Sequence, residues 1–262
     1  MSDTSKWLSS LISLNKFDKI EIRPLVGGKF KLDQRDDCLV ANYWRTTASV
    51  ESILALNHVK HIQAIAGATR SLFEIAIDAA LIDLVPRAPE KIVAFVEVEK
   101  MRSAHAIVRF KRLNPAAEVN EATFQEFVAS EGDRITSLRD DLWPNRPDVK
   151  HWSLLKLEKR VEKVGNPFDE IYAIDYPRLS WYVHSGLTGF SQVADTHYHS
   201  MAGLSFIIAT KSYMALMATI ITSLRFDARD PRLKEKMLFA QMAPWTDGKE
   251  QVQQLKKELG FG

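Results

Sequence analysis

Residues 62–85 read IQAIAGATRSLFEIAIDAALIDLV, and this stretch decides the fold. It contains no proline, and its apolar residues recur at helical spacing on almost every side of a helix. A helix that is apolar nearly all round is normally buried among other helices. The stretch therefore predicts the central helix of an all-α, multi-helix bundle.

Three charged residues interrupt this helix. Arg70, Glu74 and Asp78 stand four residues apart and therefore share one narrow arc of its surface. In one interpretation they form a line of intrahelical ion pairs along a solvated edge. In the other they point into the bundle, where unpaired charges are costly and must be matched. Glu74 would then hold Arg70, whose guanidinium would face a ligand or another helix. The spacing does not choose between the two.

Helical patterns continue on both sides of this stretch. They begin near Asp36 and break near residues 57–61, and Pro86 and Pro89 end the central helix. The later pattern predicts helices at about 90–113, 120–142, 153–164, 168–184 in two short pieces, 199–224, 231–242 and 248–259. No strand pattern recurs, so a parallel α/β sheet is not expected. We expect one helical bundle domain of about eight helices over residues 35–262.

The first 34 residues have a different character. Residues 20–23 alternate between apolar and polar side chains like a strand, Pro24 ends the alternation, and Gly27 and Gly28 mark a turn. We expect a short irregular or hairpin appendage at residues 1–34.

The composition is that of a soluble globular protein. Lys and Arg number 35 and Asp and Glu 33, so the net charge of +2 requires no polyanionic partner. The single cysteine, Cys38, excludes a disulfide framework and a cysteine-built zinc site. The N-terminus does not resemble a secretory signal, so we expect a cytoplasmic location. Lys211 divides the most apolar segment, residues 201–224, which predicts a buried core helix and no membrane span.

A second polar line lies in the segment DYPRLSWYVHSG, residues 175–186. Pro177 suits the first turn of a helix and Asp175 can cap it. Tyr176, Ser180 and His184 then recur every four residues and share one face. A histidine in the last helical turn can act as a general acid or base, or it can be a buried residue tied by one hydrogen bond.

The two polar lines carry a resemblance to a known family. Arg70-Ser71-Leu72-Phe73-Glu74, the segment that begins Lys150-His151-Trp152-Ser153, and Tyr176-x-x-x-Ser180-x-x-x-His184 together resemble a bacterial all-helical family of unknown function. The resemblance covers roughly residues 40–225 and implies no activity.

The chain also resembles HEPN domains, helical bundles that include metal-independent ribonucleases of toxin–antitoxin and phage-defence systems. Their motif is an arginine followed after four to six residues by a histidine, and five residues separate Arg178 from His184. The resemblance implies that these two side chains act on the RNA 2′-hydroxyl and the scissile phosphate, commonly in a homodimer. Two features depart from the pattern. Leu179 stands where a polar residue is usual, and in a continuous helix residues six apart point about 120° from each other.

Other patterns predict less. His58 with His61, and His197 with His199, could bind a metal only if the fold joined the pairs, and no di-iron or zincin spacing is present. No glycine-rich phosphate loop occurs either, so we expect no metal and no cofactor. Residues 97–112 and 148–163 are rich in Lys and Arg. They could contact an RNA backbone or a protein partner, or they could be plain solvated faces.

Two hypotheses for function follow. In the first, the protein is a HEPN-like, metal-independent endoribonuclease with His184 as acid or base and Arg178 as phosphate contact. Ser180 and Tyr176 would orient the base or substrate, and Arg70 and Glu74 would support them. In the second, the protein is a non-enzymatic helical interaction module, in which the line from Tyr176 to His184 is a buried hydrogen-bonded tie.

Overall fold

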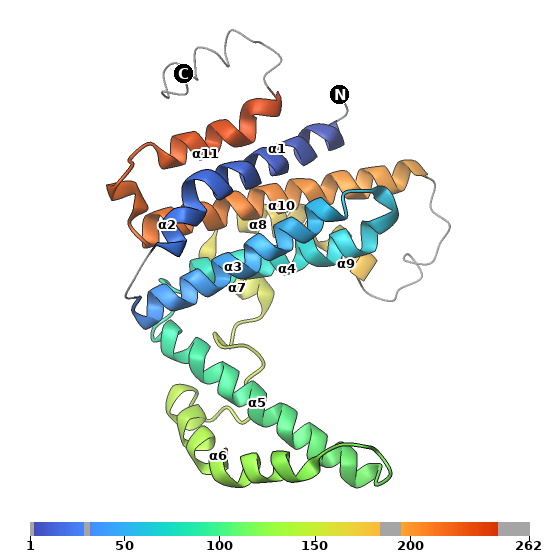
Figure 1. Cartoon of the computed structure of the whole chain (residues 1–262), viewed down its shortest axis with the longest axis vertical. Helices are drawn as coiled ribbons and strands as arrows, with labels where there is room; N and C mark the ends of the chain where they lie inside the picture. Colours follow the sequence, from blue (N-terminus) through green and yellow to red (C-terminus); the bar gives the residue numbers. More distant parts are fainter. Residues whose placement is uncertain (1–2, 29–31, 184–194, 246–262) are drawn as a thin grey trace. The chain divides into compact units, whose positions relative to one another are not determined.

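The computed structural model describes residues 3–28, 32–183 and 195–245, which form helices and connecting turns with no β-strand among them (Figure 1). The all-α, multi-helix prediction is thus confirmed for this part of the chain. The helices gather into two compact units, one of residues 1–84 with 157–262 and one of residues 85–156. The predicted domain boundary near residue 35 stays a prediction.

The larger unit is built around two core helices, α4 and α10. Its elements are α1 (Asp3–Phe17), a π-helical turn (Asp18–Ile22), α2 (Arg23–Gly27), α3 (Gln34–Ala55), α4 (Ile62–Leu81), α7 (Leu157–Val164), α8 (Phe168–Ile174), α9 (Tyr176–Val183), α10 (Asp195–Ser223) and α11 (Leu233–Met242), with 3-10 turns at Val59–His61, Phe226–Ala228 and Ala243–Trp245. Helix α10 packs against α4, α3, α1, α9 and α11, and α4 also packs against α3, α7 and α9 (Figure 1). Most of the surface of α4 is therefore covered by other helices, and Gln63, Ala64 and Ser71 are its exposed residues.

The prediction of a central helix at residues 62–85 is confirmed. Ile65, Leu72, Phe73 and Ile77 have no exposed surface, and they point from α4 into the core. The predicted break near residues 57–61 is also present, since α3 ends at Ala55 and α4 begins at Ile62. The helix predicted at residues 248–259 lies outside the described residues.

The hairpin predicted for the N-terminal segment is wrong, because residues 3–27 are helical. Leu11, Leu14, Ile22 and Val26 are buried at helical spacing, and Asp18 fills the gap in the series. Ile20, which made the sequence look like a strand, is 60% exposed. The charge of Asp18 hid a helical pattern that runs through the whole segment.

Helix α10 has the length and composition that would let residues 199–223 cross a membrane. Most of that window is nevertheless buried against the other helices of the unit. The segment is a core helix, as its sequence predicts, and the absence of a membrane span stays a prediction.

The smaller unit is a pair of packed helices with a following loop. Helices α5 (Ala88–Leu113) and α6 (Glu121–Leu142) pack against each other, and the chain then continues through residues 143–156. The buried Trp143 donates a hydrogen bond from Nε1 to the carbonyl of Trp152 at 2.9 Å, which fixes this loop. Few large side chains are buried between the two helices, so the unit has a thin core.

A buried carboxylate joins the N-terminal helices to the core of the larger unit. Asp18 has no exposed surface, and its Oδ1 accepts a hydrogen bond from the Tyr43 hydroxyl at 2.6 Å. Arg23 donates to Oδ2 at 3.2 Å. Burial raises the pKa of Asp18, while Tyr43, Tyr213 and Arg23 act in the opposite direction. The carboxylate is therefore held in the core by its donors.

Removing one of those donors tests this arrangement. Tyr43→Phe leaves Asp18 buried without its shortest hydrogen bond, and we expect the free energy of unfolding to fall by about 1–3 kcal/mol. Tyr172→Phe is the control, because the Tyr172 hydroxyl has no hydrogen bond to a described residue. Urea denaturation of both variants measures the difference. If both variants lose the same free energy of unfolding, the hydrogen bond from Tyr43 to Asp18 does not stabilise the fold.

Candidate functional site

Three helices meet at the polar stripe of α4. Arg70 Nε donates to Glu74 Oε1 at 3.0 Å, one turn along the same helix. Arg160 of α7 donates from one guanidinium nitrogen to Asp78 Oδ1 at 2.8 Å, and its other terminal nitrogen lies 3.8 Å from Glu74 Oε2. The two acidic side chains of α4, Glu74 and Asp78, are thus both close to a cation that α7 supplies.

The third contribution comes from α9. The Tyr176 hydroxyl donates to Glu74 Oε1 at 2.7 Å, and the guanidinium of Arg70 lies 5.5 Å from the centre of the Tyr176 ring. The ring also packs against Phe73 and stacks with Tyr172. Burial, followed by the hydrogen bond to Glu74, raises the pKa of the Tyr176 hydroxyl. We call Arg70, Glu74, Asp78, Arg160 and Tyr176 the α4 cluster.

The α4 cluster decides between the two interpretations of the charged stripe. The Arg70, Glu74 and Asp78 side chains are 27%, 32% and 21% exposed, so the stripe is not a freely solvated edge. Arg160 is only 8% exposed. The charges of α4 face neighbouring helices and are matched there, as the second interpretation expects. The two motifs of the sequence, at residues 70–74 and at Tyr176, are joined through Glu74.

A more open group of charges lies where α8 meets α9. Lys211 of α10 forms an ion pair with Glu170 of α8 at 3.3 Å. Burial raises the pKa of the Asp175 carboxyl, and the nearby charges of Lys211 and Arg178 lower it. Arg178 is exposed and has no hydrogen bond or ion pair with any described residue. We call Glu170, Asp175, Arg178 and Lys211 the α9 corner.

The predicted catalytic residues have different positions relative to these two groups. Tyr176 belongs to the α4 cluster and Arg178 to the α9 corner. Ser180 lies within α9, but its side chain is outside the described residues, as is the whole of His184. The pairing of Arg178 with His184 therefore stays a prediction.

Neither histidine pair is shown at a metal site. The rings of His58 and His61 lie 6.4 Å apart. His199 is exposed, while the side chain of His197 falls outside the described part of the chain. Within that part, no group of three or more His, Cys, Asp or Glu side chains is arranged to hold a metal ion.

The two basic segments have fewer free cations than their sequences suggest. Lys100 pairs with Glu97 and Arg102 with Glu99 on α5, and Lys159 pairs with Glu162 on α7. Each pair is three residues apart on an exposed helix face. These faces are therefore partly neutralised by their own acids.

Sequence reasoning missed Arg160 and did not place Asp175 or Lys211 in a functional site, although it gave Asp175 a role as a helix cap. Nothing in the segment LEKRVEK distinguishes Arg160 from the other cations of α7, because its partner lies 82 residues earlier. Lys211 did carry a signal. It is the only charged residue in a long apolar run, and such a residue needs a partner or an opening to water.

Comparisons with known proteins give one match. A family model described as "Family of unknown function (DUF5677)" matches residues 36–200. Neither the curated proteins nor the solved structures contain a match to this chain.

Substitution of two adjacent cations of α7, Arg160 and Lys159, tests whether the α4 cluster stabilises the fold. Arg160→Ala leaves Asp78 and Glu74 without their buried cation, and we expect it to lower the free energy of unfolding by about 2–4 kcal/mol. Lys159→Ala removes an exposed ion pair from the same helix and should cost little. Chemical denaturation measures both losses. Equal losses would mean that the cluster does not stabilise the fold.

The pKa of Asp175 yields a second prediction. Its folded-state pKa is raised above 3.8, so the stability it contributes is present in acid and lost as the pH rises through the folded pKa. We expect Asp175→Asn to be more stable than the wild type at neutral pH and to lose this advantage near about pH 3, where the carboxyl is protonated in both states.

Urea denaturation at several pH values measures this effect. Asp133→Asn, at an exposed position of α6, is the control. A pH-independent difference between Asp175→Asn and the wild type would contradict the prediction.

Proposed function

The chain belongs to the family of unknown function DUF5677, and from the α4 cluster and the α9 corner we propose that it is a HEPN-like, metal-independent endoribonuclease of a toxin or phage-defence system. The observation that carries the proposal is the position of Arg178. This exposed cation lies on a helix whose first residue, Tyr176, is hydrogen-bonded to the central helix of the unit. A cation on a fixed helix is suited to binding a phosphate.

Each residue has a role in the proposed cleavage. His184 takes the proton from the RNA 2′-hydroxyl, whose oxygen attacks the adjacent phosphorus while the bond to the 5′-oxygen breaks. The products are a cyclic phosphate and a 5′-hydroxyl, which receives a proton. Arg178 neutralises the charge that develops on the phosphate. The chemistry needs no redox partner and no cofactor.

The other members of the two groups support this site in the proposal. Glu74 holds Tyr176, and Arg70 lies over the Tyr176 ring, so α9 is fixed at its first turn. Lys211 brings a second cation to the corner, within electrostatic reach of Asp175. A carboxyl with a raised pKa beside two cations is typical of functional sites. Ser180 would orient the base or the substrate.

The second candidate is a non-enzymatic interaction module. One observation favours it: the Tyr176 hydroxyl is buried and is used in binding Glu74, so at this residue the polar line of α9 is a structural tie. If the whole line has this role, Arg178 is a contact for a protein partner. Any loss of function in a His184 variant would then follow the loss of stability.

An RNA cleavage assay separates the two candidates. We expect the purified full chain to cut single-stranded or structured RNA in the presence of EDTA. His184→Ala and Arg178→Ala should each reduce cleavage at least about a hundredfold, within the range for removal of one acid–base or charge-stabilising group. Arg146→Ala, an exposed arginine of the smaller unit, should cut like the wild type.

Circular dichroism and thermal melting complete the experiment. Unchanged melting of the inactive variants would support a chemical role for both residues. Intact RNA after incubation with folded wild-type protein, across varied substrates, would contradict the proposal. The proposal would also be contradicted if cleavage by the His184→Ala and Arg178→Ala variants fell only in proportion to their melting temperatures.

A further inference from the structure

Helix α5 carries a seam of mainly apolar residues on its exposed side, with Glu99 and Ser103 among its seven members. Its members recur at alternating steps of four and three residues, the spacing by which one helix contacts another along its length. They are Ile92, Val96, Glu99, Ser103, Ala106, Phe110 and Leu113. Val96 and Phe110 are each 50% exposed and Leu113 is 68% exposed. Within the smaller unit, the seam therefore has the pattern of a helix–helix contact, and no helix of that unit covers its exposed members.

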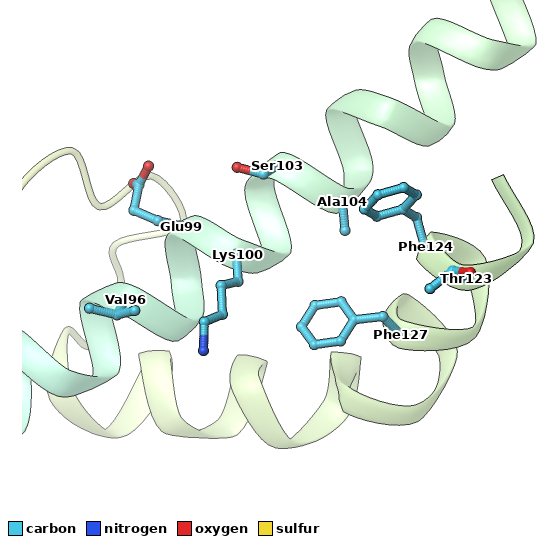
Figure 2. Close-up of a pocket in the computed structure, with 8 residues that line it drawn as sticks. All are labelled: Val96, Glu99, Lys100, Ser103, Ala104, Thr123, Phe124 and Phe127. Atoms are coloured by element: carbon cyan, nitrogen blue, oxygen red, sulfur yellow. The ribbon is translucent and has the colours of Figure 1, made fainter. Parts of the chain in front are cut away.

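Helix α6 occupies a different face of α5. The buried residues of α5 are Ala88, Ala94, Val98, Met101 and Ala104, and none belongs to the seam. In Figure 2, Glu99 and Ser103 point to the opposite side of α5 from Lys100, while the rings of Phe124 and Phe127 project from α6 toward α5. The contact with α6 thus leaves the seam open.

An apolar groove continues the seam toward α6. It has a volume of about 530 Å³, and seam residues Val96, Glu99 and Ser103 form part of its wall (Figure 2). Phe124 and Phe127 supply the wall on the α6 side. Seam and groove together form a largely apolar surface on a unit whose own core is thin, and covering it would stabilise that unit.

The charges along α5 indicate which partner fits. The N-terminal half contains all the acids of the helix, and the C-terminal half contains only bases. The acids are Glu90, Glu97 and Glu99, and the bases of the C-terminal half are Arg102, Arg109, Lys111 and Arg112. The N-terminal half also contains Lys91 and Lys100, so its net charge is −1 against +4 for the C-terminal half. Arg109 and Arg112 have no ion pair with a described residue. Two such helices repel when parallel and attract when antiparallel.

The spacing of the seam, like the charges, favours an antiparallel pair of α5 helices. Ser103 is the middle member of the seam, and an antiparallel copy of α5 that crosses at Ser103 places Val96 opposite Phe110 and Ile92 within one residue of Leu113. The small side chains of Ser103 and Ala106 lie at the crossing, where close approach is needed. A two-fold axis through this point makes the surface complementary to itself.

We propose that this surface binds a second copy of the chain, with the two α5 helices antiparallel and crossing at Ser103. The seam belongs to the smaller unit, whereas the α4 cluster and the α9 corner are built from residues of the larger unit. The pairing therefore does not depend on the proposed ribonuclease activity, and either can fail while the other holds.

Cross-linking of engineered cysteines tests the crossing point. The native Cys38 is buried and gives little background. We expect the wild type to sediment as a dimer, and Ser103→Cys to form a disulfide-linked dimer with oxidised glutathione. Ser130→Cys, an exposed serine of α6, should stay unlinked. A wild type that sediments as a monomer, or a Ser103→Cys dimer that does not link, would overturn the proposal.

A second pair of variants tests the orientation. In the antiparallel arrangement the two Val96 residues lie about 20 Å apart, from seven residues of helical rise on each side of the crossing. Val96→Cys should therefore link to Phe110→Cys when the two proteins are mixed, and should not link to itself. Self-linking of Val96→Cys would show parallel helices and overturn the proposal.

Discussion

The larger unit depends on one physical constraint, the cost of removing charges from water on a helix that is otherwise apolar. Helix α4 must be central, because Leu72, Phe73 and Ile77 cannot all face solvent. Its Arg70, Glu74 and Asp78 are then drawn partly out of water, and they need partners. Arg160 and Tyr176 meet that need from α7 and α9. The packing of these two short helices on the core is therefore tied to electrostatics as well as to apolar burial.

The same cost of burying a charge is met differently at Asp18, where the N-terminal helices join the core. Asp18 is fully buried, and its partners are a tyrosine hydroxyl and a guanidinium from nearby segments. The α4 cluster stays one-fifth to one-third exposed at its carboxylates and Arg70. The α9 corner is more open again, since Arg178 is exposed. Access to water thus increases from Asp18 to the α4 cluster and then to Arg178, and a group that meets a substrate must lie at the accessible end of this series.

Much of the fold could be predicted from sequence because apolar periodicity is a local property. The central helix, the break before Ile62 and the short helices around Asp175 all follow from spacing, prolines and glycines. The N-terminal segment failed because buried Asp18 interrupted the periodicity, and a buried charge cannot be recognised without its partners. For the site, spacing predicted that Glu74 would hold Arg70. It could not identify Arg160, whose contact with Asp78 joins residues 82 positions apart.

The two units place different demands on their side chains. The larger unit surrounds α4 and α10 on several sides, so the buried and half-buried charges of Asp18 and the α4 cluster are matched within one chain. The smaller unit is a helix pair whose core is too thin to cover both faces of α5, and an exposed seam with a regular repeat is left over. Chance exposure of apolar residues produces scattered positions, whereas the exposed Val96 and Phe110 stand fourteen residues apart, with Ser103 midway between them, on a helix whose charge changes sign along its length. A repeat, an opening and a charge gradient on one helix have a common explanation if α5 evolved to contact another helix. Because the surface is complementary to itself, the α5 helix of a second copy of the chain is the simplest partner.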